Sequence, residues 1–242
     1  MPFSHRHNPT HGPSSDGPAV RVSPRYLAGD DGLLADRVTA ALTGAGWSHR
    51  TTRHSTPRLH SFDQLRGADW LQGAPELFLD DSVVVWTLFA RRHVEGLPVW
   101  TAHFTLHTPH EPVVAFATAL ATTPDVVRGT ESGRAALEPL AEADWAPDPT
   151  DAGNTFWAPR LQACVSHRAL PPEIHDGNPL PDLPGYLAYA EVADLAPRQW
   201  VAAFSPSTPP DLVRAFTECL ADPSPVERTT VPADAEGYLF YT

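Results

Sequence analysis

The chain has 242 residues and a formal net charge of −12, and all 17 of its basic residues are arginine. With 42% hydrophobic residues, it is long enough to bury a substantial core. No run of 18 apolar residues and no charged-then-apolar leader occurs, so we expect neither a membrane span nor a secretory signal. Two cysteines, Cys164 and Cys219, are too few for a disulfide scaffold and favour a cytoplasmic location.

The charge is distributed unevenly along the chain. Residues 1–128 hold 11 Arg and 12 acidic residues, whereas residues 129–242 hold 6 Arg and 17 acidic residues. This composition excludes a uniformly basic nucleic-acid-binding protein but not a local basic patch.

Residues 1–18 are mostly Pro, Ser, Gly and His. Such a segment cannot bury enough apolar surface to order itself, so we expect a disordered tail. His5, His7 and His11 in this tail could bind a metal weakly, although a flexible polar tail is the simpler interpretation.

We assign residues 19–128 to a first repeat that begins with a helix. Asp30 or Asp31 is expected to cap this helix, and Gly44 and Gly46 to end it. Its apolar stripe has the i, i+4 spacing of an amphipathic helix and consists of Leu34, Val38, Ala41, Leu42 and Ala45. Residues 47–53 and 59–62 then read as strands.

The segment 47–60 contains several arginines and no acidic residue. If its strands form a hairpin next to a later strand, the possible nucleic-acid contacts are Arg50, Arg53, Arg58, Arg91 and Arg92. Aromatic faces that could stack on unpaired bases are available nearby in sequence, at Trp47, Phe62 and Trp86. The alternative is a solvated hairpin with aromatic residues in the core.

The strongest pattern in the chain is an internal repeat. Residues 100–128 and 200–228 are identical at 12 of 29 positions without a gap. In each copy the first apolar residues, Trp, Ala and Phe, stand at every second position, which predicts a half-buried strand. An apolar stripe at helical spacing follows. The conserved structural positions are Trp100, Phe104, Thr108, Pro109 and Phe116, and their counterparts Trp200, Phe204, Thr208, Pro209 and Phe216.

The turn between strand and helix has the composition of a capped helix start. Thr108 and Thr208 are good N-cap residues, and the proline after each suits the first helical position. Glu111 and Asp211 are placed to return the capping bond.

A second echo, Leu-x-x-Ala-Asp-Trp, relates residues 65–70 to residues 140–145. Its smaller offset places the additional residues of the second repeat, 129–242, in a Pro-rich exposed loop at 171–185. We therefore predict an α+β fold: a tandem repeat of a three- to four-stranded antiparallel sheet followed by a capped amphipathic helix. One copy would leave a sheet face uncovered, so the two copies should pack together.

The Trp-x-Ala-x-Phe motif with its Thr-Pro turn, the Ala-Phe-x-x-x-Leu helix and their duplication resemble the SPDY domain, a domain of unknown function numbered 317. The resemblance covers roughly residues 20–242. It implies two tandem copies and an actinobacterial origin. It implies no activity and no functional residues, because none is assigned to the family.

Familiar catalytic and phosphate-binding motifs do not occur in the sequence. His103, His107 and His110 flank the first strand–helix turn. They could form a metal site, for which Glu111 is the nearest candidate for a further ligand. The second copy has Ala203, Ser207 and Pro210 at these positions, so the fold does not require the histidines.

We therefore expect a non-enzymatic binding or regulatory module that acts through a partner surface and needs no cofactor. The partner is either a protein or a single-stranded nucleic acid, the latter bound weakly through segment 47–60. An enzyme with a His103/His107 site is the third hypothesis.

Overall fold

The computed structural model describes residues 18–51, 57–71, 77–124, 133–151, 153–168, 184–192 and 197–242. The tail predicted at 1–18 and the loop predicted at 171–185 lie almost wholly outside these residues. The elements of the first half are β1 (Val20–Ser23), η1 (Arg25–Leu27), α1 (Leu34–Gly44), β2 (Ser48–Thr51), β3 (Pro57–His60), β4 (Arg66–Trp70), β5 (Phe78–Leu79), β6 (Ser82–Arg91), β7 (Pro98–Thr105) and α2 (His110–Thr122). Those of the second half are η2 (Gly133–Leu137), α3 (Glu138–Glu142), β8 (Ala146–Pro147), β9 (Thr155–Trp157), β10 (Ala163–His167), β11 (Tyr186–Ala190), β12 (Trp200–Phe204), α4 (Pro210–Ala221), β13 (Val226–Arg228), η4 (Glu236–Tyr238) and β14 (Phe240–Tyr241).

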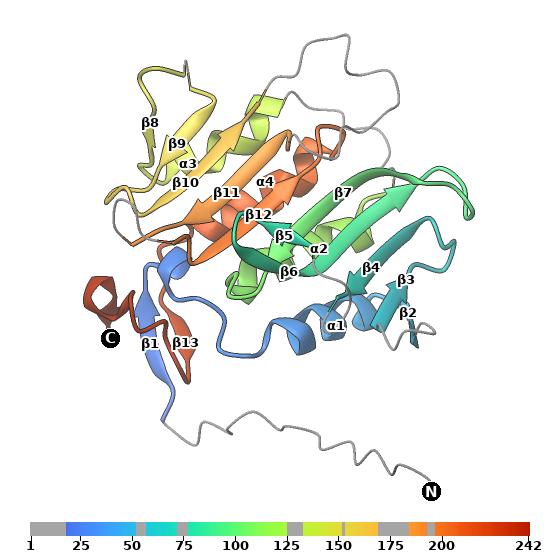
Figure 1. Ribbon diagram of the computed structural model, residues 1–242, viewed down its shortest axis with the longest axis horizontal. Coiled ribbons are helices and arrows are strands. Elements are labelled where there is room, and N and C mark those ends of the chain that lie inside the picture. Colours follow the sequence, from blue (N-terminus) through green and yellow to red (C-terminus); the bar gives the residue numbers. More distant parts are fainter. Residues whose placement is uncertain are drawn as a thin grey trace, which may run out of the picture.

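One long antiparallel sheet joins the two halves (Figure 1). Within the described residues its strand order is β2-β3-β4-β6-β7-β12-β11-β10-β9-β8, with β5 paired to β6 beside this path. Each half therefore contributes five strands in opposite order, and the last strands of the halves, β7 and β12, meet at the centre. The predicted α+β fold is confirmed, although each half has more strands than the three or four expected.

The pairing of β7 with β12 obeys the 100-residue repeat. In the register of this pair, Ala203 lies opposite His103, and the flanking pairs are Phe104 with Ala202 and Ala102 with Phe204. A residue just before His103 therefore pairs with the residue just after Ala203, and the reverse also holds. Ala102, for example, pairs with Phe204, which is the copy of Phe104. A pseudo-twofold axis therefore passes between His103 and Ala203.

Two hydrogen bonds across this strand pair follow the same axis. The backbone N–H of Val201 donates to the Thr105 hydroxyl at 2.8 Å, and the N–H of Thr101 donates to the Ser205 hydroxyl at 3.0 Å. The two bonds are counterparts of each other under the 100-residue offset. Thr105 and Ser205 therefore connect the halves through side chains as well as through the strand ladder.

Four phenylalanines beneath this strand pair repeat the symmetry. The rings of Phe104 and Phe116 are 5.6 Å apart at 68°, and those of Phe204 and Phe216 are 5.3 Å apart at 69°. The crossed pairs, Phe104–Phe216 and Phe116–Phe204, are 5.9 and 5.5 Å apart at 35° and 40°. All four side chains are fully buried, so the core of each half is completed by the other.

The helices cover the sheet face that carries these phenylalanines (Figure 1). Helices α2 and α4 contact each other across the axis, with α1 beside α2 and α3 beside α4. The predicted alternation is confirmed in β7, where the buried residues Trp100, Ala102 and Phe104 alternate with partly buried ones. In β12 all five residues are buried, so the predicted half-buried strand is wrong there.

The predicted helix caps are wrong. Helix α2 begins at His110 after Pro109, without a side-chain capping bond, and α4 begins in the same way after Pro209. Thr108 is buried, and its hydroxyl donates instead to the carbonyl oxygen of Thr105 at 2.9 Å. Glu111 pairs with Arg228. A cap at α1 from Asp30 or Asp31 is also absent in the structure, because Leu33 holds the N-cap position without a side-chain bond.

The echo between residues 65–70 and 140–145 is also wrong as a structural match. The first segment forms strand β4, whereas the second ends helix α3. The structural counterpart of Trp145 is Trp47, which follows α1. The N–H groups of Trp47 and Trp145 donate to Leu42 and Leu140, five residues earlier, at 3.0 Å in both cases. The helix before the strands is therefore part of the repeat in both halves.

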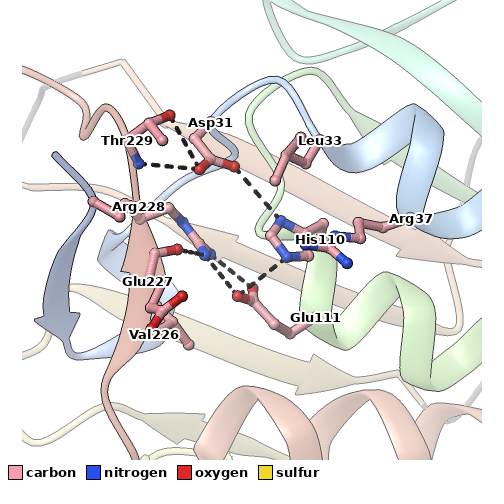
Figure 2. A pocket seen from close by; sticks show the side chains of 10 residues that line it. Asp31, Leu33, Arg37, His110, Glu111, Val226, Glu227, Arg228 and Thr229 are labelled. Carbon is pink, nitrogen blue, oxygen red and sulfur yellow. Dashed lines mark hydrogen bonds and ion pairs between the residues drawn. The ribbon is translucent and has the colours of Figure 1, made fainter. Parts of the chain in front are cut away.

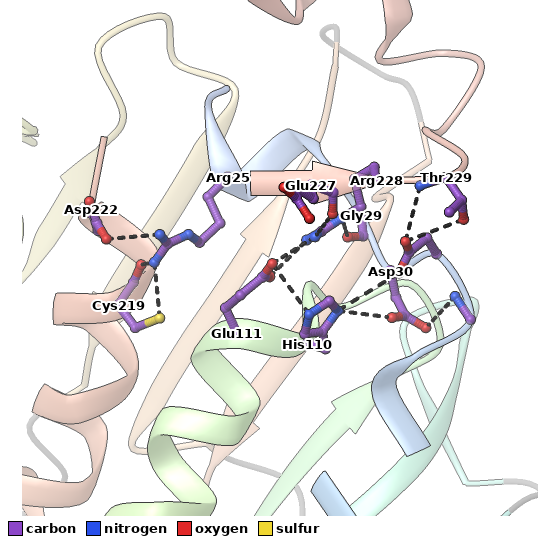
Figure 3. Close-up of polar contacts among 12 residues, drawn as sticks. Arg25, Gly29, Asp30, His110, Glu111, Cys219, Asp222, Glu227, Arg228 and Thr229 are labelled. Carbon is purple, nitrogen blue, oxygen red and sulfur yellow. Dashed lines mark hydrogen bonds and ion pairs between the residues drawn. The ribbon is translucent and has the colours of Figure 1, made fainter. Parts of the chain in front are cut away.

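The two ends of the described chain meet in a small sheet in which β1 lies between β13 and β14. Two arginines hold this region onto the helices (Figure 3). Arg25 donates to Asp222 Oδ2 at 2.8 Å and to Cys219 Sγ at 3.0 Å. Arg228, 1% exposed, donates to the Gly29 carbonyl at 2.9 Å. Arg25 thus anchors the start of the described chain to the end of α4, and Arg228 anchors β13 beside the starts of α1 and α2.

The central aromatic cluster should carry a large share of the stability. We expect Phe104→Ala and Phe204→Ala each to lower the free energy of unfolding by about 3–5 kcal/mol, because each leaves a cavity in the shared core. Phe62→Ala is the matched control, since its side chain is 100% exposed and its loss should change stability by less than about 0.5 kcal/mol. Urea denaturation measures all three. Unequal effects of the two core variants would argue against an energetically symmetric core.

Candidate binding surface

The sheet face opposite the helices carries several of the residues that the sequence analysis selected. The strand registers place one row of side chains across this face, because directly paired residues share a side of the sheet. In the first half and at the axis this row is Arg50, Arg58, Asp69, Thr87 and His103. The prediction that segment 47–60 forms a hairpin is confirmed by the pairing of β2 with β3.

Arg50 and Arg58 lie directly opposite each other on β2 and β3. Arg50 is exposed. Arg58 donates two hydrogen bonds, each 2.5 Å long, to the carboxylate of Asp69 on β4. These bonds raise the pKa of Arg58. Asp69 thus offsets part of the positive charge that the sequence segment carries.

His60 marks the centre of this basic area. It is 7% exposed and lies on the same side of β3 as Arg58. Burial lowers the pKa of His60, and the guanidinium groups of Arg58, Arg91 and Arg50 lower it further, against a smaller opposing effect of Asp69. Burial and the guanidinium charges therefore both favour the neutral form of the imidazole.

Phe62 is the one predicted stacking residue that is accessible. It is 100% exposed in the turn after β3, whereas Trp47 and Trp86 are 6% and 0% exposed and belong to the core. Arg91 holds the same turn, because its N–H donates to the Leu65 carbonyl at 2.8 Å and its Nε to the Gln64 carbonyl at 3.0 Å. We call Arg50, Arg58, His60, Phe62 and Arg91 the basic corner.

Next to the basic corner, the Phe89 ring packs directly against Gly67 on the neighbouring strand. A Cβ atom at Gly67 would come within 2.3 Å of the Phe89 ring, so no other residue fits there without movement. The Arg91 guanidinium lies 5.8 Å from the centroid of this ring. Of the other predicted contacts, Arg92 is exposed just after β6, and Arg53 lies outside the described residues.

The three predicted histidines do not form one site. His103 lies on the open face, with Nδ1 3.0 Å from the Thr87 hydroxyl, and burial lowers the pKa of His103 to about 4. His107 is exposed in the turn before α2, with a φ of 85°. His110 lies at the start of α2, between Asp30, Asp31 and Glu111 (Figures 2 and 3). No pattern in the sequence indicates these aspartates as neighbours of His110.

The open face of the second half differs in chemistry from the first. Cys164, Tyr189 and Val201 form a small apolar cluster there, and Leu79 from β5 packs against it. The Arg198 guanidinium lies 3.9 Å from the centroid of the Tyr189 ring and pairs with Asp80. Burial raises the pKa of the Cys164 thiol to about 11, so it is protonated at neutral pH. The open face of the first half thus carries charged side chains. On the open face of the second half, the apolar cluster is contacted by Leu79 of β5, which belongs to the first half.

None of the helices in the described part of the chain has both the length and the apolar content that crossing a bilayer requires.

Comparison with known protein families gives a match in both halves. Residues 60–127 and 187–226 match SPDY, described as a domain of unknown function (DUF317). Each half of the chain therefore contains a segment that matches the SPDY domain, and the two segments are consistent with two copies. No curated protein and no solved structure matches the chain. The cytoplasmic location and the actinobacterial origin stay predictions.

The environment of His103 predicts a pH dependence of stability. Its folded-state pKa of about 4 lies below the ordinary 6.5. A folded state that resists protonation loses stability as the pH falls from 6.5 towards 4, because the unfolded chain binds the proton first. The loss should reach on the order of 3 kcal/mol at the acid end.

His103→Ala, which introduces the residue of the second copy, should remove this part of the pH dependence. Denaturation of both proteins at pH 7.5 and pH 4.5 measures it, and their common titrations cancel in the difference. Parallel stability curves for the two proteins over this range would contradict the assignment.

Proposed function

We propose that this protein, which matches the SPDY domain in both halves, is a non-enzymatic binding module that holds single-stranded nucleic acid on its basic corner. The observation that carries the proposal is the fully exposed ring of Phe62 in a turn held by Arg91 and next to a strand pair that carries Arg50 and Arg58. A single exposed phenylalanine is not unusual by itself, so the proposal depends on the arginines of the same turn and of the adjacent strand pair. Beside guanidinium groups, such a ring is a stacking platform for a base.

The division of labour within the basic corner follows from its contacts. Arg50 is exposed and can bind a phosphate, whereas Arg58 is already engaged by Asp69. Arg91 uses its Nε and backbone N–H to fix the turn. The two outer nitrogens of its guanidinium group do not take part in these bonds and can donate to a phosphate. Few phosphate contacts and a chain charge of −12 predict weak binding with a shallow salt dependence. Stacking requires unpaired bases, which favours single strands over duplexes.

Fluorescence anisotropy with a labelled oligothymidine strand at low salt tests the proposal. Phe62→Ala should weaken binding by about 5- to 100-fold, since stacking contributes about 1–3 kcal/mol per base. The combined Arg50→Ser and Arg91→Ser variant should flatten the dependence of log K on log salt by about 1.4, the effect of two lost phosphate contacts on a single strand.

Two controls separate the site from bulk effects. Leu161→Ala removes another exposed apolar side chain, 63% exposed in the second half. Arg37→Ser removes an exposed charge from α1, away from the open face. Both should bind like the parent. If the parent shows no binding at high micromolar concentration, or if the controls weaken binding equally, the basic corner is not a nucleic-acid site.

A second candidate, a protein partner, is favoured by a separate observation. Leu77, Phe78, Val83 and Leu106 are 40–48% exposed and adjacent, because Phe78 pairs with Val83 and the N–H of Leu106 donates to the Val83 carbonyl. We call these four residues the apolar corner. Adjacent exposed apolar side chains of this kind mark protein contacts. Retention of a partner from nuclease-treated lysate that Phe78→Ser abolishes and Phe62→Ala leaves intact would favour this candidate.

A further inference from the structure

A second cluster of polar side chains lies on the helix side of the molecule, where three distant segments meet (Figures 2 and 3). Asp30 and Asp31 come from the loop before α1, and His110 is the first residue of α2. His110 Nδ1 is 3.4 Å from Asp30 Oδ1 and 3.9 Å from Asp31 Oδ1. The three side chains are 9%, 2% and 12% exposed, so both carboxylates are at least nine-tenths buried.

One atom of each side chain in this cluster has no hydrogen-bond partner among the described residues. These atoms are Asp30 Oδ1, Asp31 Oδ1 and His110 Nδ1, and all three are enclosed. Buried polar atoms are almost always satisfied, so three that converge need an explanation. Their ligand atoms lie within 4.8 Å of one another.

The remaining oxygens of the two carboxylates are anchored. Asp30 Oδ2 accepts the N–H of Gly32 at 3.1 Å. Asp31 Oδ2 accepts the N–H of Thr229 at 3.2 Å, and the Thr229 hydroxyl lies 3.4 Å away. Each carboxylate is therefore fixed by one oxygen while the other points towards His110. The arrangement is set by the backbone and does not depend on the imidazole.

The far side of the imidazole is also held. His110 Nε2 lies 3.4 Å from Glu111 Oε1, and Arg228 donates to both oxygens of Glu111 at 2.6 and 2.7 Å. A carboxylate on one ring nitrogen of a histidine orients the ring and leaves the other nitrogen free to bind a metal. Because the Glu111 and Arg228 charges cancel, the net charge left at the cluster is that of the two aspartates.

We infer that Asp30, Asp31 and His110 form a binding site for a divalent cation of the Zn²⁺ or Mn²⁺ class. One imidazole nitrogen and two carboxylate oxygens are ligands that such ions accept. Ligand atoms about 2.0–2.2 Å from a zinc ion lie about 3.4 Å from one another in a tetrahedron, which is the separation of His110 Nδ1 and Asp30 Oδ1. A dication would also balance the charge of two carboxylates whose side chains are at least nine-tenths buried.

The cation has a route in and space for further ligands. A cleft of about 320 Å³ is lined by Asp31, His110 and Glu111 on one side and by Arg228 and Thr229 on the other (Figure 2). Three protein ligands leave at least one coordination position for water. The ion would join the loop before α1 to α2 and, through Thr229, to the end of β13. The second copy has Pro210 in place of His110, so the start of α4 lacks the histidine of this site.

The competing explanation is that a proton on His110 holds the two carboxylates without a metal. Isothermal titration calorimetry and thermal melts of the full chain, freed of metal by a chelator and titrated with ZnCl₂, MnCl₂ or MgCl₂, distinguish the two. His5, His7 and His11 are replaced by serine in every protein tested, so that the tail contributes no histidine ligand. We expect one Zn²⁺ or Mn²⁺ per chain and a melting temperature raised by roughly 5–10 °C at a hundred times the Kd.

His110→Ala should abolish the binding and the thermal shift, and Asp31→Asn should weaken binding at least tenfold. His107→Ala is the matched control, because it removes an exposed histidine from the same turn. His110→Pro, the residue of the second copy, serves if His110→Ala fails to fold. The inference is overturned if neither ZnCl₂ nor MnCl₂ at 1 mM produces heat or stabilisation, or if the His110 variants bind as the parent does.

Discussion

The antiparallel pairing of β7 with β12 is the interaction on which the rest of the molecule depends. Without it, the last strand of each half would be an exposed sheet edge, which soluble proteins avoid. The same pairing brings α2 against α4 and brings four phenylalanines together beneath the axis. Sheet continuity, helix packing and the aromatic core therefore form or fail together.

Much of this fold is predictable from the sequence, because the repeat states its own pattern twice. The alternation around Trp100 and Trp200 identifies the buried face, and the stripes that include Phe116 and Phe216 locate the helices. The caps were not predictable from residue type. Thr108 is drawn into the core, where its hydroxyl satisfies Thr105 instead of the helix. Tertiary packing thus overrides a local capping preference at this turn.

The second failure has a different cause. Residues 65–70 and 140–145 share four letters, but one segment is in a strand and the other ends a helix. The true counterpart of Trp145 is Trp47, and the residues before it share only Leu and Ala with those before Trp145. What the two sites share is a helix end in which the residue before the tryptophan, Gly46 or Asp144, has a positive φ. Backbone geometry of this kind leaves little trace in composition.

In the candidate sites too, features set by neighbours in the sequence were predictable, whereas features set by the packing of distant segments were not. Segment 47–60 is basic in the sequence and on the surface, because a hairpin keeps sequence neighbours together. That Asp69 neutralises Arg58 follows only from the placement of β4 beside β3. Residue type alone does not predict that Phe62 is exposed whereas Trp47 is buried, because both are large aromatic residues. Asp30 and Asp31 reach His110 only through the packing of α1 against α2, which no spacing in the sequence encodes.

The position of His103 on the pseudo-twofold axis has an evolutionary consequence. Two halves that meet through the same strand in opposite directions have the geometry of an isologous dimer, in which every residue on the axis faces its own copy. Two separate, identical chains would place two imidazoles side by side on this sheet, with Cβ atoms about 4.5–5.5 Å apart. Fusion into one chain removes that constraint, because each half can mutate alone. Ala203 gives His103 a neighbour without a titratable group, which identical subunits could never provide.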